Sequence, residues 1–153
     1  MSNYCRHGIH DYASMDSVLR SATLLSAPSS VQWIECMHKA FCDLKQALTS
    51  APALGLPDYH QPFHLHVHEK DGYASGILVQ KHGSHYRHVT CSSSRLPPVA
   101  LGMVGCLRSV SDIGTMIDKS SPIVLGQYCV IHVPHAVLQI LNTSTTQQKE
   151  IWL

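Results

Sequence analysis

The sequence predicts an α/β protein built on a mixed sheet, with helical residues first and the later elements in the order β-β-β-α-β-α. Three observations carry this prediction: a helical apolar stripe before residue 50, a change to strict alternation at residue 63, and short turns between three extended runs. The length of 153 residues suits one domain with a core, or a small domain with a helical appendage.

The first fifty residues are expected to be helical. A short helix is predicted from about Asp16 to Ala22. A clearer signal follows residue 28, where apolar residues recur at spacings of three and four along one stripe: Ile34, Met37, Phe41, Leu44 and Leu48. Ser29 and Gln32 resemble a capping box at the start of this helix, and Ala51-Pro52 ends it.

Residues 63–91 predict an antiparallel meander that follows a connector punctuated by proline and glycine. In its first run, FHLHVHE, three apolar residues alternate with three histidines, which is the pattern of a strand with one buried face. A second run covers residues 76–80 beyond a turn at residues 70–72. A third covers residues 86–91 beyond a turn at residues 82–84.

After the meander the pattern changes to helix, strand and helix. Leu96-Pro97-Pro98 opens a helical stretch in which five apolar residues could share a face: Val99, Met103, Leu107, Val110 and Ile117. A strand is expected over residues 128–133, and Pro134 is placed to begin a helix through Leu141. Three meander strands, a crossover helix and a further strand form the layout of a ribonuclease H-like fold.

Composition limits the classes of partner. Charged residues make up 14% of the chain and the net charge is +1, so no basic field indicates nucleic-acid binding, and weak or no contact with nucleic acid is expected. No apolar run reaches the roughly 18 residues of a membrane span. The six cysteines form no C-x-x-C pair, which favours an intracellular, cytoplasmic location with reduced thiols.

Several long stretches carry a family resemblance. Residues 40–81 resemble the junction between the thumb and connection domains of gammaretrovirus-type Pol polyproteins, with the sequence AFCDLKQALTSAPALGLPDYHQPFHLHVHEKDGYASGILVQK. The next two segments of that connection domain resemble SSSRLPPVALGMVGCLRSV and VLGQYCVIHVPHAVLQIL, and the end of the thumb resembles NYCRHGIHDYASMDSVLR. No stretch matches the Tyr-x-Asp-Asp motif of the polymerase active site.

The resemblance implies a fragment of an endogenous retroviral reverse transcriptase. It implies a helical thumb remnant over residues 1–50, a ribonuclease H-like connection domain over residues 51–142 and a polar tail over residues 143–153. In the family a further strand and helix would follow, and without them an exposed sheet edge favours a protein partner or self-association. We therefore expect a non-catalytic structural or interaction module. The alternative is a ribonuclease H-type hydrolase that cleaves RNA in RNA–DNA hybrids.

The resemblance also indicates where catalysis would need carboxylates. A hydrolase of this kind holds two Mg²⁺ ions with acidic side chains. Matching by residue places His68, Gly105 and Pro134 at three of these positions, and the fourth falls beyond the end of the chain. Because Mg²⁺ requires oxygen ligands, no catalytic residue and no cofactor are expected. In the alternative, a register shift of one residue brings in Glu69 and Mg²⁺ is bound.

The alternating histidines are candidate metal ligands. His64, His66 and His68 share one face of the expected strand, where residues two apart lie about 6.6 to 7 Å from each other. A tetrahedral zinc site could use two neighbours at most, so other ligands would have to come from adjacent strands, such as His85, His88 or His132. The other interpretation is that all three are ordinary surface side chains, and no bound metal is expected.

Three further features have ordinary interpretations. Ser92-Ser93-Ser94 is interpreted as a polar strand end, and Cys106 as a small buried residue. Arg87, Arg95 and Arg108 are interpreted as solvated side chains, although they could touch a nucleic-acid backbone.

Overall fold

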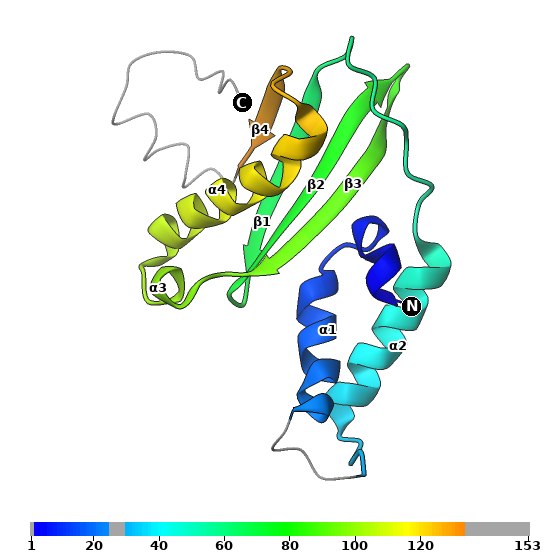
Figure 1. Ribbon diagram of the computed structural model, residues 1–153, viewed down its shortest axis with the longest axis vertical. Coiled ribbons are helices and arrows are strands. Elements are labelled where there is room, and N and C mark those ends of the chain that lie inside the picture. The colour runs from blue at the N-terminus through cyan, green and yellow to red at the C-terminus, as the bar shows by residue number, and fades with distance from the viewer. Residues whose placement is uncertain (1, 25–29, 134–153) are drawn as a thin grey trace.

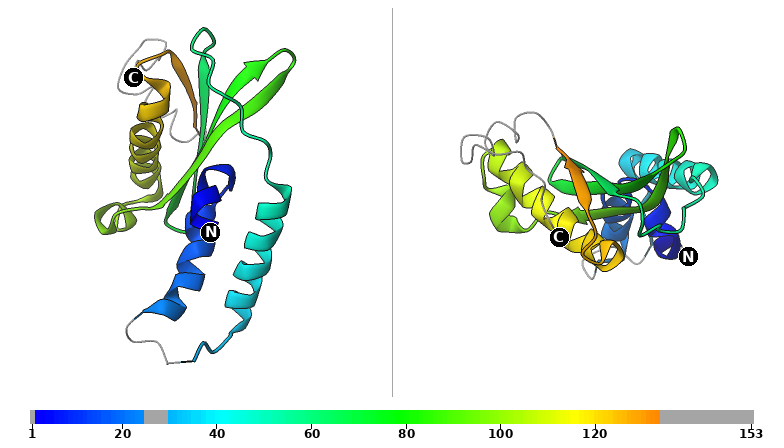
Figure 2. Two further views of the ribbon diagram at one scale, coloured as in Figure 1. Left: turned by 45° about the vertical axis from the view of Figure 1, so that its right-hand side comes forward. Right: turned by 90° about the horizontal axis from the view of Figure 1, so that it is seen from above.

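The computed structural model describes residues 2–24 and 30–133 (Figure 1). The helix predicted to begin at Pro134 and the polar tail lie outside the described residues. The N-terminal part contains η1 (Ser2–Gly8), α1 (Tyr12–Arg20), η2 (Ser21–Thr23) and α2 (Glu35–Ser50). Helix α1 is therefore longer at its start than predicted, and α1 and α2 lie side by side away from α4 (Figure 2).

A four-stranded sheet forms the centre of the remaining chain. Its strands are β1 (Phe63–Lys70), β2 (Tyr73–His82), β3 (His85–Arg95) and β4 (Cys129–His132). They lie in the order β3-β2-β1-β4, with β1 antiparallel to β2, β2 antiparallel to β3, and β1 parallel to β4. The predicted order of three meander strands, a helix and a fourth strand is confirmed, and with it the mixed α/β class.

The turn between β1 and β2 shows why the meander forms here. Asp71 and Gly72 both have positive φ, 53° and 79°, as a two-residue hairpin turn of mirror-image type requires. Gly72 also has Leu101 beside it, since a Cβ at this glycine would lie 2.6 Å from the leucine side chain. The Asp-Gly pair thus fixes the register in which Lys70 faces Tyr73.

One helix, α4 (Gly105–Val124), connects β3 to β4 and covers one face of the sheet, after the short α3 (Pro98–Leu101). The predicted alternation of β1 is confirmed, because the residues buried in the core are Phe63, Leu65 and Val67. Met116 lies close to β2, where a Cβ at Gly76 would come within 2.9 Å of its sulfur. A glycine in mid-strand therefore lets the helix approach the sheet closely.

The predicted apolar face of this crossover helix is wrong. The exposed members are Val99, Met103, Leu107 and Val110, and Ile117 is partly buried against the core. The core instead takes Ile113, Met116 and Val124. A break at residues 102–104 separates α3 from α4, so one helical period does not run through both. The buried face begins only at Asp112.

The predicted apolar stripe of α2 is only partly buried. Leu44 is buried with Ile9 and Tyr12, whereas Ile34, Phe41 and Leu48 are exposed. The helix packs on α1 through the adjacent face, which carries the small residues Ala40 and Ala47. The capping box is wrong as well, because α2 begins at Glu35 after an N-cap, Ile34, that makes no side-chain cap hydrogen bond.

Three polar contacts attach α1 to the side of the sheet opposite α4. Ser75 of β2 donates a hydrogen bond to Asp11, whose pKa is lowered chiefly by a hydrogen bond from His10. The other two contacts join the Ala13 amide to the Ser93 hydroxyl at 2.9 Å and the Tyr73 hydroxyl to the Ser17 hydroxyl at 2.7 Å. The helical part therefore rests on β2 and β3.

Two expectations from composition can be checked on the described residues. All six cysteines are free thiols, as expected. Within residues 2–24 and 30–133, no helix combines the length and apolar character needed to cross a bilayer.

The attachment predicts the effect of Ser75→Ala. Removing the hydroxyl leaves Asp11 without this donor and should cost about 1 kcal/mol in the free energy of unfolding. Amide hydrogen exchange should become faster in α1 while β1 stays protected. Ser94→Ala is the matched control, since within residues 2–24 and 30–133 the Ser94 hydroxyl donates only to the neighbouring Arg95 carbonyl, at 3.5 Å. Equal effects of the two variants would contradict the assignment.

Candidate functional site

Two carboxylates meet where β1 ends beneath α4. Glu69 is the second-last residue of β1, and its Oε2 forms an ion pair with Arg108 Nε of α4 at 3.2 Å. Its Oε1 accepts a hydrogen bond from the Gly72 amide at 2.9 Å. Glu69 is therefore held by one ion pair and by one hydrogen bond from the hairpin turn, and the prediction that Arg108 is solvated is wrong.

Asp112 is the second carboxylate, one helical turn after Arg108. Only 2% of its surface is exposed, and its Oδ1 has no hydrogen-bond partner among the described residues. Burial, and then the negative charge of Glu69, raise the pKa of Asp112 to about 7. A large share of this side chain is thus a neutral acid at neutral pH, and the pair carries less negative charge than two free carboxylates.

The positions matched from the sequence are not brought together. His68 is exposed on the face of β1 that points away from α4, and Gly105 is the exposed first residue of α4. Pro134 lies outside the described residues. Their assignment as former catalytic positions remains a prediction. Asp112 was missed, although an acid next to Ile113 in an otherwise apolar helical face is the signal that could have found it.

The histidine face of β1 forms a cluster with His132, one of the partners expected from adjacent strands, and the cluster leaves out His68. His132 of β4 joins His64 and His66, with 3.1 Å between His64 Nδ1 and His132 Nε2. The rings of His66 and His132 stack at 4.2 Å between centroids and 7° between planes. Tyr86 meets His64 edge-on at 5.2 Å. His68 is not part of this cluster and lies instead near Asp11.

Both β1 histidines of this cluster have a lowered pKa. For His64 the causes are partial burial, then the charges of His132 and Lys81. For His66 they are partial burial, then the charges of His132 and His64. The lowered pKa values favour the neutral form of His64 and His66 at pH 7. In the described part of the chain, no group of three or more His, Cys, Asp or Glu side chains is arranged around a common metal position.

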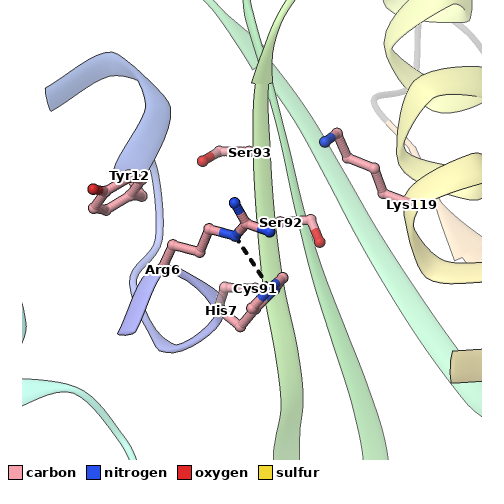
Figure 3. Close-up of a pocket in the computed structure, with 7 residues that line it drawn as sticks. All are labelled: Arg6, His7, Tyr12, Cys91, Ser92, Ser93 and Lys119. Atoms are coloured by element: carbon pink, nitrogen blue, oxygen red, sulfur yellow. Dashed lines mark hydrogen bonds between the residues drawn. The ribbon is translucent and has the colours of Figure 1, made fainter. Parts of the chain in front are cut away.

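A pocket of about 280 Å³ lies where η1 and α1 meet the edge strand β3. Figure 3 shows the residues that line it: Arg6, His7, Tyr12, Cys91, Ser92, Ser93 and Lys119. Arg6 Nε donates to His7 Nε2 at 3.2 Å, and its guanidinium lies over β3 while Lys119 points toward Ser92 from α4. Two cations and three hydroxyls, those of Tyr12, Ser92 and Ser93, with no lining carboxylate make this pocket suited to an anion.

The structure also places the remaining serine, cysteine and arginine candidates from the sequence. Ser92 and Ser93 lie within β3 rather than in a turn at its end, and both line this pocket. Cys106 is half-buried rather than fully buried. Arg87 packs its stem against the backbone of Gly55, where a Cβ would come within 2.8 Å of it.

The buried acid predicts a specific pH dependence. Because the pKa of Asp112 is raised from 3.8 to about 7, the folded chain binds its proton more tightly than the unfolded chain. Stability from this group is therefore full below about pH 4 and is lost as the pH rises through 7. Asp112→Asn should raise the free energy of unfolding at pH 8 by roughly 2 to 4 kcal/mol and change it little at pH 4.

Denaturant unfolding of both proteins from pH 4 to pH 8 measures this effect. The informative quantity is the difference in the free energy of unfolding between the two proteins, because other groups titrate equally in both. A difference that does not change with pH would contradict the raised pKa of Asp112.

Comparison with known proteins places this arrangement in a family. The family model described as the RNase H-like domain found in reverse transcriptase matches residues 33–131. The Pol polyprotein of feline endogenous virus ECE1 is 41% identical over 141 residues, which are 92% of this chain and 13% of that protein. The Gag-Pol polyprotein of koala retrovirus is 36% identical over 141 residues, 92% of this chain and 8% of that protein.

Solved structures show the same fold. The foamy viral protease-reverse transcriptase in complex with dsDNA, in its dRH form, has a TM-score of 0.71 at 15% identity, covering 91% of this chain and 25% of that one. The foamy viral protein in complex with an RNA/DNA hybrid has a TM-score of 0.67 at 14% identity, covering 94% of this chain and 20% of that one. Such neighbours do not fit the expectation of weak or no nucleic-acid contact.

The chain corresponds to a small part of each of these relatives. The present chain spans only 13% and 8% of the lengths of these Pol and Gag-Pol polyproteins. The predicted resemblance to gammaretroviral Pol is confirmed over most of the chain, and the domain boundary at residue 50 remains a prediction. The chain belongs to the family of RNase H-like domains found in reverse transcriptase, in the form present in gammaretroviral Pol polyproteins.

Proposed function

We propose that this chain is a non-catalytic module of a retroelement reverse transcriptase that joins thumb-like helices to a ribonuclease H-like sheet. Its free thiols favour an intracellular location. Its work is structural: it holds a nucleic-acid duplex and neighbouring protein segments in place. The observation that carries the proposal is the state of the two carboxylates beside α4. Glu69 is engaged by Arg108, and Asp112 is buried with no partner for its Oδ1 in the described part of the chain.

This state is unfavourable for hydrolysis through metal ions. Two Mg²⁺ ions need several ionised carboxylates that can exchange water for metal. Here Arg108 supplies a positive charge at the place where a metal would bind, and the raised pKa of Asp112 favours its neutral form. His68, on the opposite face of β1, offers nitrogen where Mg²⁺ prefers oxygen.

A ribonuclease H-type hydrolase is the second candidate, because Glu69 and Asp112 do lie together on β1 and the crossover helix. For Mg²⁺ to bind there, Arg108 would have to leave Glu69, and Asp112 would have to release its proton to solvent. In that case both acids would be ligands, and their loss would remove activity.

Cleavage of a labelled RNA–DNA hybrid separates the two candidates. We expect no cleavage by the purified chain in Mg²⁺ or Mn²⁺ above the level in EDTA, and no change with Glu69→Ala or Asp112→Asn. Lys39→Ala, on the exposed side of α2, is the control for preparation and handling. Cleavage that is kept in Lys39→Ala and lost in both acid variants, with melting curves showing folded protein, would establish the hydrolase instead.

The module needs a surface for the duplex, and the pocket at the β3 edge supplies one. Arg6 and Lys119 reach it from the helical part and from α4, so a phosphate there would contact both parts of the chain. Ser92 and Ser93 add hydroxyl donors for phosphate oxygens. Contacts of this kind are independent of base sequence and sensitive to salt.

Fluorescence anisotropy with a labelled RNA–DNA hybrid tests this contact. The double variant Arg6→Ala/Lys119→Ala should weaken binding for every duplex sequence and lower the slope of log K against log salt by about 2. Lys39→Ala/Lys45→Ala removes the same charge from α2 and should leave most of the slope. If the α2 variant loses as much as the pocket variant, binding depends on net charge and the pocket is not the contact.

A further inference from the structure

The imidazole cluster on the open face of the sheet is built by strand pairing. In the register of the parallel pair β1 and β4, His66 lies directly opposite His132. His64 lies opposite Val130, which is two residues before His132. The backbone hydrogen bonds of two paired strands thus fix the positions of all three histidines. No rearrangement of the chain is needed to bring the rings together, and His66 and His132 are exposed to solvent.

The separation of the two nearest nitrogens suits one shared ion. His64 Nδ1 and His132 Nε2 are 3.1 Å apart. Imidazole nitrogens bind Zn²⁺ at about 2.0 to 2.1 Å, which puts two of them about 3.3 Å apart at a tetrahedral angle and about 2.9 Å apart at a right angle. The observed distance falls between these values. Small ring rotations would therefore turn a hydrogen-bonded pair into a pair of ligands.

The chemistry of the donors selects the class of ion. Imidazole suits Zn²⁺, Cu²⁺ and Ni²⁺, whereas Mg²⁺ and Ca²⁺ require oxygen. Water would complete the coordination, because the pair offers only two nitrogens, His64 Nδ1 and His132 Nε2. Lys81 contributes a nearby positive charge, which opposes a cation and keeps the affinity modest.

His66 has a different place in this cluster. Its ring lies parallel to that of His132 at 4.2 Å, so neither of its nitrogens points to the position between His64 and His132. The stack holds the His132 ring in its orientation. His66 is therefore a positioning residue, and a flat apolar ring could replace it.

We propose that His64 and His132 form a two-histidine site for a divalent first-row transition ion, with His66 orienting His132 by stacking. The site lies on the face of the sheet opposite α4 and shares no residue with the carboxylate pair or the β3-edge pocket. It is independent of the proposed function, so either can fail alone. With half the ligands of a structural zinc site, a dissociation constant on the order of 10 µM is expected.

Calorimetric titration of the untagged chain with ZnCl₂ at pH 7.5 tests the site. His64→Ala and His132→Ala should each weaken the tightest binding event at least tenfold. His68→Ala is the matched control, because His68 lies on the same strand and the same face but outside the cluster. This variant should bind Zn²⁺ with the same affinity as the unaltered chain. Circular dichroism melting checks that every variant is folded, which their exposed positions favour.

Two more measurements complete the test. His66→Phe should keep the affinity and His66→Ala should lose part of it, since only the first retains a stacking ring. Histidine ring signals in NMR spectra should broaden first at His64 and His132 on addition of substoichiometric Cu²⁺. The proposal is overturned by uptake that persists in the His64 and His132 variants, by equal loss in His68→Ala, by loss in His66→Phe, or by the absence of any Zn²⁺ uptake.

Discussion

The pairing of β1 on both sides fixes the two faces of the central strand, and the other features of the molecule depend on it. Antiparallel pairing with β2 and parallel pairing with β4 leave β1 no freedom to slip by one residue. Its apolar residues then face α4, and its histidines face the other way. A slip of one residue would put three imidazoles into the core and three apolar side chains on the surface.

The same constraint determines what the end of β1 can do chemically. Glu69 has the parity of the core-facing residues, so it lies beneath α4 and meets Arg108. Asp112, one turn further along α4, then lies in a buried place where its charged form is costly. The chain thus places two acids beside each other, but Arg108 and burial oppose the ionised, accessible state that metal binding needs.

The helical part extends this arrangement rather than adding a separate body. Asp11, Ala13 and Ser17 bond to β2 and β3 on the face that α4 leaves open. This attachment covers the face around Ser75 and Ser93 and leaves His66 and His132 exposed. It also brings Arg6 to the edge of β3 opposite Lys119, so the cationic pocket exists only when both parts are folded together.

The sequence by itself determined the order of the elements, the two hairpin turns, the buried face of β1 and the family. These depend on local properties: side-chain alternation, the positive φ of an Asp-Gly pair, and long similar stretches. The apolar faces of α2 and α4 could not be chosen correctly, because Phe41 and Leu107 are as apolar as Leu44 and Ile113, and only the position of the neighbouring element decides which is buried. The tertiary structure alone decided that Asp112 lies beside Glu69 and that His132, rather than His68, completes the imidazole cluster. Both are contacts between residues more than forty positions apart, and such distances are set by strand pairing and helix packing, which no local pattern records.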